Sequence, residues 1–113
     1  MSRRLCFALD LRSDPALIAE YERVHVEGIV PTTIVKNSRA QGIQTMEIWR
    51  TGDRLLMILE VDERYPRVNR DDATQAKVDR WEWLMWNFQQ PLPHASIGEK
   101  WVAMKRIFNL ADF

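Results

Sequence analysis

The stretch Ile43–Val61, with the sequence IQTMEIWRTGDRLLMILEV, decides the fold. Residues 43–50 and 54–61 both follow the two-residue period of a β-strand, with Glu47 on the same predicted face as Ile43. The short connection around Gly52 predicts that they pair as an antiparallel hairpin. Both faces of the second strand are apolar, so a covering layer is expected on each side of it.

The segments on either side of the hairpin predict two helices and two more strands. Asp14 and Pro15 are the cap and first residue expected of a helix that runs to Gly28. A second helix is predicted from Asp72 or Thr74 to about Phe88, because its apolar residues recur at helical spacing. The remaining predictions are a strand over 4–11, a short helix over 31–38 that ends before Gly42, a loop over 62–72, and a last strand over 99–110.

This order of strand, helix, strand, strand, helix, strand predicts an α+β fold with the ferredoxin-like β-α-β-β-α-β pattern. The chain of 113 residues has the length of one domain, so residues 1–113 are expected to form a single unit. Two helices can cover only one face of a four-stranded sheet. The second apolar face of residues 54–61 therefore predicts a homodimer in which two sheets face each other, a dimeric α+β barrel.

Composition narrows the class of protein. Lys and Arg number 16, as do Asp and Glu, and no basic run is present, so neither nucleic acid nor a membrane surface is expected as a partner. No apolar run could span a bilayer, and Asp10 and Arg12 interrupt the first apolar stretch too early for a signal peptide. The single Cys6 excludes an intramolecular disulfide and predicts a buried thiol in a cytoplasmic protein.

Tyr21 and His25 are the first candidates for chemistry. They are four residues apart on a predicted helix, so both side chains project from one face, at the end of an apolar stripe that includes Leu17. Histidine can take up and release a proton near neutral pH. Because such a pair is more often a packing contact than a catalytic one, the rest of the chain has to decide its role.

Trp81, Glu82 and Glu47 complete the set of candidates. An indole offers a flat apolar surface for the C–H face of a sugar, and a carboxylate forms charge-assisted hydrogen bonds with its hydroxyl groups. Packing in the core is the alternative for Trp81, and a solvated surface position is the alternative for Glu82. Glu47 is expected either to face a cleft or to pair with Arg50 or Arg54. No phosphate-binding glycine loop, serine elbow or metal-binding His or Cys cluster is present, so no metal site is expected.

Four segments together resemble the L-rhamnose mutarotase family, and within it the branch of L-fucose mutarotases. They occur in order and at the spacing of the family, and the resemblance runs nearly from end to end. The segments are Ala19–His25 (AEYERVH), Gly42–Ile48 (GIQTMEI), Trp81–Pro93 (WEWLMWNFQQPLP) and Gly98–Phe108 (GEKWVAMKRIF).

The resemblance implies a homodimeric α+β barrel without a cofactor that interconverts the α and β anomers of a deoxy-hexose monosaccharide. It also implies that His25 is the proton donor, that Tyr21 contacts the substrate, and that Trp81 and Glu82 hold the sugar. Met46 stands where rhamnose-specific members have a substrate-binding tyrosine, as in the L-fucose branch.

One segment departs from the family pattern. The family usually carries a Trp-Pro pair shortly after the histidine, whereas this chain reads Gly28-Ile29-Val30-Pro31. Two further functions stay open beside an L-fucose mutarotase. One is a cofactor-free or haem-handling monooxygenase, because the same barrel fold hosts such enzymes. The other is a sugar-binding module without catalytic activity, which the missing tryptophan keeps open.

Overall fold

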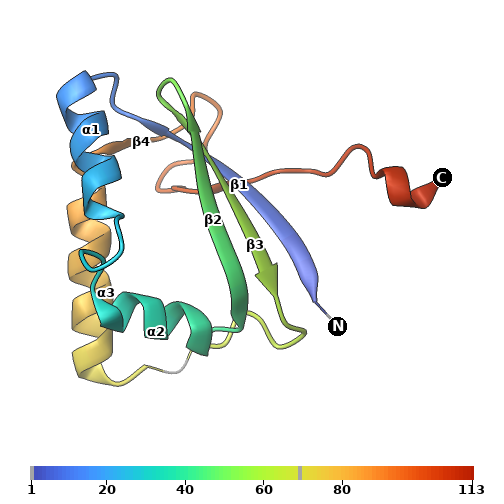
Figure 1. The fold of residues 1–113 in the computed structure, drawn as a ribbon, viewed down its shortest axis with the longest axis horizontal. Helices are drawn as coiled ribbons and strands as arrows, with labels where there is room; N and C mark the ends of the chain where they lie inside the picture. Colours follow the sequence, from blue (N-terminus) through green and yellow to red (C-terminus); the bar gives the residue numbers. More distant parts are fainter. Residues whose placement is uncertain (1, 69) are drawn as a thin grey trace.

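A computed structural model describes residues 2–68 and 70–113, and its centre is a curled antiparallel sheet (Figure 1). The strands run in the order β2-β3-β1-β4, and β5 pairs with β1 on the same side as β4. The elements are β1 (Arg3–Leu11), α1 (Pro15–Val24), α2 (Thr32–Ala40), β2 (Ile43–Thr51), β3 (Arg54–Val61), α3 (Asp72–Met85), β4 (Gln89–Gln90), β5 (Val102–Ala103) and the 3₁₀ helix η1 (Leu110–Asp112).

The predicted hairpin and ferredoxin-like order are confirmed. β2 pairs with β3, and β3 pairs with β1 along its whole length, from Arg3 opposite Val61 to Asp10 opposite Arg54. The three α-helices lie on one side of the sheet (Figure 1), so only one of its two faces is covered within the chain. None of the helices within 2–68 and 70–113 is long and apolar enough to cross a membrane.

Local signals set where α1 begins. The carboxylate of Asp14 accepts hydrogen bonds from the backbone N–H groups of Ala16 (2.9 Å) and Leu17 (3.2 Å), which satisfies two donors of the first turn. The helix ends at Val24, earlier than the predicted end at Gly28, and His25 is its C-cap residue. The helix predicted over 31–38 is confirmed as α2.

The core between helices and sheet has two parts. One joins α1, α3 and the end of the sheet near β4, and its buried members include Tyr21, Leu55 and Met85. The other lies at the opposite end of the sheet around Ile43 and Leu59. Residues of both parts line a single cavity, so the space between them is not filled by side chains.

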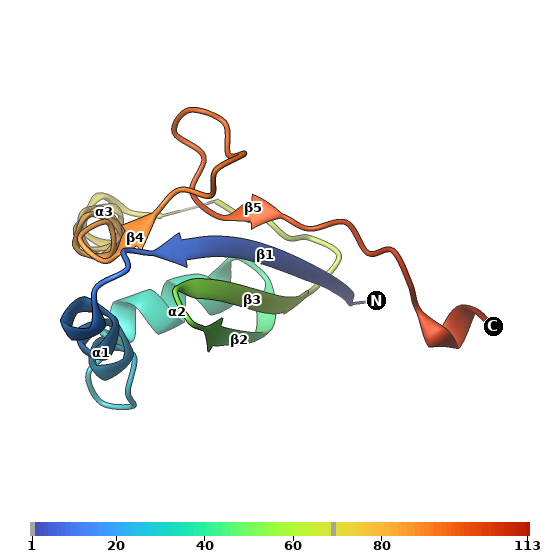
Figure 2. The same cartoon turned by 90° about the horizontal axis from the view of Figure 1, so that it is seen from above.

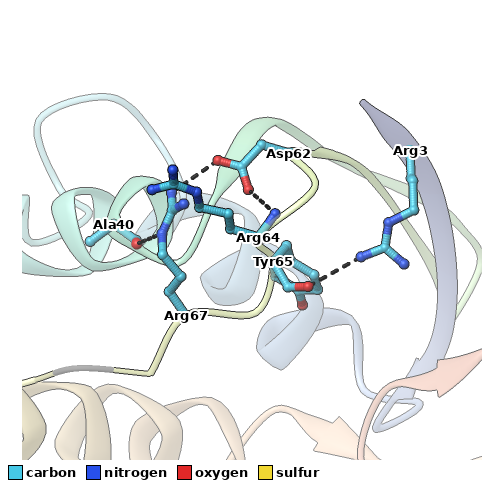
Figure 3. Close-up of polar contacts among 6 residues, drawn as sticks. All are labelled: Arg3, Ala40, Asp62, Arg64, Tyr65 and Arg67. Carbon is cyan, nitrogen blue, oxygen red and sulfur yellow. Dashed lines mark hydrogen bonds and ion pairs between the residues drawn. The ribbon is translucent and has the colours of Figure 1, made fainter. Parts of the chain in front are cut away.

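The segment between β3 and α3 is bonded to the end of α2 and to the start of β1 (Figure 3), the latter through Arg3, which donates to the Tyr65 carbonyl at 3.2 Å. Asp62 accepts hydrogen bonds from the Arg64 N–H (3.0 Å) and from the guanidinium of Arg67 (2.9 Å), and Arg67 also donates to the Ala40 carbonyl (3.2 Å). Desolvation raises the pKa of the Asp62 carboxyl. The hydrogen bonds and the charge of Arg67 lower it by more, so the pKa of Asp62 lies below its usual value. Gly42 lies against the same carboxylate with a φ of +107°, and a Cβ there would stand 2.5 Å from an Asp62 oxygen. This contact leaves room only for glycine.

Two predicted boundaries are wrong near the C-terminus. α3 ends at Met85 rather than Phe88, because residues 89–90 pair with Asp10 and Leu11 as β4 and the chain has to leave the helix before them. The last strand is only Val102–Ala103, not 99–110. After the bond from the Met104 N–H to the Cys6 carbonyl (2.8 Å), the chain leaves the sheet and runs outward past the start of β1 (Figures 1 and 2).

The face on which Glu47 lies is also different from the prediction. A β-bulge in β2 places Ile43 opposite Val61 but Thr45 opposite Glu60, so Gln44 is an extra residue. One extra residue turns every later side chain to the other face of the sheet. Glu47 therefore lies on the uncovered face, where its carboxylate accepts from the Trp49 indole N–H (3.1 Å).

Candidate active site

A cavity of about 690 Å³ lies between the helices and the covered face of the sheet, in the size range of small-molecule sites. Its floor is formed by β2 and β3 through Met46, Ile48 and Met57, and its walls come from α1, α2 and α3. The predicted residues Tyr21, His25, Trp81 and Glu82 all line it. Glu47 is not among its lining residues, and neither Arg50 nor Arg54 pairs with it, since these bind Glu22 and Asp10.

Tyr21 and His25 lie against each other at one end of this cavity, with their ring planes tilted by 43°. Their ring centroids are 4.3 Å apart, and the imidazole meets the Trp81 indole edge-on at 5.7 Å. α1 holds Tyr21 with its ring buried, while His25 follows the last helical residue and is half-buried. The two side chains therefore lie side by side, as their spacing of four residues predicts, although α1 ends between them.

The hydrogen bond of His25 defines the state of its ring. Nδ1 lies 2.6 Å from the backbone carbonyl oxygen of Tyr21. A carbonyl oxygen can only accept, so Nδ1 carries the proton and Nε2 of the neutral ring is the basic nitrogen. Burial lowers the pKa of His25 below its ordinary value, and the bond to the Tyr21 carbonyl partly opposes this shift. The imidazole is therefore neutral, and a proton acceptor, at pH 7.

The phenol of Tyr21 is protonated at neutral pH. Burial raises the pKa of Tyr21, the hydrogen bond from Gln89 lowers it, and the negative charge of Glu82 raises it further. Gln89 Nε2 donates to the phenol oxygen at 3.3 Å, and Gln89 Oε1 is buried with no partner among the described residues. Leaving such a carbonyl oxygen unsatisfied costs roughly 1–3 kcal/mol.

Glu82 forms an ion pair with Lys100 at the mouth of the cavity, at the end where Tyr21 and His25 lie. Lys100 donates to its Oε2 at 2.6 Å, and the ammonium group lies 5.0 Å from the centre of the Trp86 ring. The Glu82 side chain is 52% exposed, whereas that of Lys100 is 14% exposed. The carboxylate is thus held in place by a largely buried lysine and still has lone pairs for other donors.

The other end of the cavity is polar as well, and lies where α2 meets α3. Arg70 donates to Asn37 (2.8 Å) and to Gln75 (3.1 Å), and Gln75 donates to Asp79 (2.8 Å). All four residues line the cavity. Its two ends therefore offer both donors and acceptors, separated by an apolar middle, which suits a ligand with many hydroxyl groups.

Sequence reasoning missed Lys100, Gln89 and Arg70. Lys100 and Gln89 lie inside segments that carry the family resemblance, but nothing in their local pattern assigns them to the site. Val30, directly before Pro31, lines the cavity at the position where the resemblance implies a tryptophan, so this departure lies in the cavity wall. His94 is exposed and is not a lining residue. In residues 2–68 and 70–113, no group of three or more His, Cys, Asp or Glu side chains is placed to hold a metal ion.

Its fold and cavity make this a ferredoxin-like α+β protein with a tyrosine–histidine pair in a cavity between helices and sheet. The crystal structure of L-rhamnose mutarotase FA22100 from Formosa agariphila has the same fold, with a TM-score of 0.66 at 15% identity over 96% of this chain and 98% of that one. The chain belongs to the L-rhamnose mutarotase family, whose model matches residues 4–110. It is therefore an isomerase.

Two relatives were found by sequence. An L-fucose mutarotase from Xanthomonas campestris pv. campestris is 44% identical over 112 residues, which cover 97% of this chain and 90% of that protein. A UPF0734 protein from Dictyostelium discoideum is 31% identical over 112 residues, which cover 94% of this chain and 88% of that protein.

Proposed function

We propose that this isomerase interconverts the α and β anomers of a deoxy-hexose, with L-fucose as its substrate and His25 as its general acid and base. The observation that carries the proposal is the fixed tautomer of His25. Its Nδ1–H is held by the Tyr21 carbonyl, so that the basic Nε2 belongs to a half-buried ring in the cavity wall. The L-fucose mutarotase among the relatives supports the choice of sugar.

Mutarotation needs only proton transfers at two neighbouring oxygens. Nε2 of neutral His25 removes the proton of the anomeric hydroxyl while the bond between C1 and the ring oxygen breaks, and the ring oxygen receives a proton from the imidazolium. The open-chain aldehyde then rotates about C1–C2. The same transfers in reverse close the ring on the other face of C1, so atoms and charge balance without a redox step. Positioned acid–base catalysis of this kind contributes ~10²–10⁴-fold.

The remaining residues bind and orient the sugar in this proposal. Trp81 offers its indole to the C–H face of the ring, and the carboxylate of Glu82, held by Lys100, accepts from hydroxyl groups. Tyr21, whose ring lies beside His25, donates a hydrogen bond from its phenol O–H to an oxygen of the sugar. Family membership favours this chemistry over the monooxygenase alternative. A second candidate function stays open, which is sugar binding without anomer exchange, because Val30 stands in the cavity wall where the resemblance implies a tryptophan.

Saturation-transfer NMR on equilibrated L-fucose tests the function, with L-rhamnose for comparison. We expect that saturating one anomeric proton lowers the signal of the other beyond the enzyme-free control, and more strongly for L-fucose. Exchange of neither sugar by the folded protein would overturn the mutarotase proposal. Line broadening of the sugar without exchange would then identify the binding module.

We also propose a homodimer formed through the uncovered face of the sheet. Apolar side chains on that face include Leu56, Ile58 and the 61% exposed Trp49, and Cys6 is half-buried there rather than buried as predicted. The segment after β5 leaves the chain's own sheet on this side (Figure 1), with Ile107, Leu110 and Phe113 among its most exposed apolar residues. A second copy would bury both surfaces at once.

Sedimentation at micromolar concentration is expected to give twice the chain mass of 13.4 kDa. Deleting residues 104–113, or replacing Trp49 by aspartate, should shift the protein toward the monomer because each removes apolar surface from the proposed interface. Val26→Asp is the matched control, since Val26 is 50% exposed and follows α1 on the helical side. A monomeric mass for the intact chain would contradict the proposal.

A further inference from the structure

Gln89 is the buried polar residue whose position the reaction described above does not explain. It is 2% exposed and belongs to β4, where backbone pairing of Gln89 with Leu11 fixes its place at the end of β1. Among the described residues its side chain forms one hydrogen bond, from Nε2 to the phenol oxygen of Tyr21, and its Oε1 has no partner there. An apolar side chain of the same length would fill this space without an unsatisfied oxygen. The amide therefore does not serve packing.

The hydrogen bond determines what Tyr21 can do. A phenol has one proton and can also accept. Because Gln89 donates to the phenol oxygen, the Tyr21 proton is not used in that bond and remains available to another acceptor. Tyr21 is 4% exposed and lines the cavity directly beside His25, so a ligand oxygen in the cavity is the acceptor within reach.

We propose that Gln89 is a positioning residue of the sugar reaction: it holds the Tyr21 phenol so that its O–H donates to an oxygen of the bound sugar, next to Nε2 of His25. Gln89 also lines the cavity, and in this proposal it acts through Tyr21. This inference rests on the proposed function, because it assigns a direction to a hydrogen bond inside the same site.

A double-mutant cycle between Gln89 and Tyr21 tests the proposal. Gln89→Met keeps the length of the side chain and removes the amide, and we expect kcat for anomer exchange to fall about 3- to 30-fold with little change in thermal stability. In a Tyr21→Phe background the same substitution should change kcat by less than about twofold, since the group it positions is gone. Gln90→Met is the matched control, because Gln90 is the exposed neighbour in the same short strand.

Equal losses from Gln89→Met in both backgrounds would show a structural role and overturn the proposal. If Gln89→Met does not fold, Gln89→Leu replaces it in the same cycle.

A second readout does not depend on activity and so separates this inference from the proposed function. The chain has two tyrosines, so the ¹³Cζ signal of Tyr21 in a tyrosine-labelled protein is assigned by its loss in Tyr21→Phe. We expect Gln89→Met to move this signal without sugar present, and Gln90→Met to leave it in place. An unmoved signal overturns the Gln89 proposal even if the wild type exchanges sugars. A moved signal in a protein that exchanges no sugar supports the contact between Gln89 and Tyr21 but rejects the proposed function, and with it the role of Gln89 in the sugar reaction.

Discussion

Replacing His25 by alanine is expected to lower enzyme-dependent anomer exchange by ~10²–10⁴-fold, the contribution of a positioned acid–base group. The loss should appear mainly in kcat, because in the proposed mechanism the imidazole acts on protons that move in the transition state, while the proposed contacts of Trp81 and Glu82 with the sugar remain. Saturation-transfer NMR at several sugar concentrations separates the two parameters. His94→Ala is the matched control, since it is the other histidine of the chain and lies exposed outside the cavity.

The pH profile of the wild type gives an independent check of the same assignment. In the proposed mechanism the neutral imidazole begins the reaction, so the rate should fall when His25 becomes protonated. Burial lowers the pKa of His25, and the neutral form therefore persists below the ordinary value of 6.5. We expect full activity at pH 7 and an acid midpoint below 6.5, after subtraction of the spontaneous rate. A folded His25→Ala protein with an unchanged rate and midpoint would contradict the role of His25.

Local patterns predicted those parts of the fold that local forces determine. The hairpin over 43–61 follows from alternation and a tight turn, and α1 begins where Asp14 can cap it. The last strand failed because a strand needs a partner strand, and partner choice is not local. Residues 104–109 have strand-like composition, but beyond Met104 the chain leaves β1 instead of pairing with it.

The cavity illustrates the same distinction. The spacing of Tyr21 and His25 placed them together, because both follow the geometry of a single helical turn. The predicted face of Glu47 is wrong, because a strict alternation does not hold through Gln44, where a bulge reverses the faces of β2. Lys100 reaches Glu82 from 18 positions further along the chain, after a loop whose path depends on tertiary packing. No local signal could predict that contact.

Glu82→Ala is expected to lower kcat/KM for L-fucose by roughly 10- to 100-fold, because hydrogen bonds to a charged group contribute about 1.5–3 kcal/mol each. The effect should fall mainly on KM and should differ between L-fucose and L-rhamnose, since the two sugars present their hydroxyl groups in different configurations. Glu82→Gln, which keeps the shape and one acceptor oxygen, should recover part of the loss. Binding and exchange are both followed by NMR.

The matched control for Glu82 is Glu22→Ala. Glu22 is 53% exposed and pairs with Arg50 at 2.8 Å, whereas Glu82 is 52% exposed and pairs with Lys100 at 2.6 Å, so the two carboxylates differ mainly in that only Glu82 lines the cavity. Loss of either exposed ion pair should change stability by less than about 1 kcal/mol. Lys100→Met should weaken sugar binding less than Glu82→Ala, because it leaves the carboxylate in place and removes only the group that orients it. If Glu82→Ala and Glu22→Ala have equal effects on exchange, Glu82 is a surface residue and the sugar is held elsewhere in the cavity.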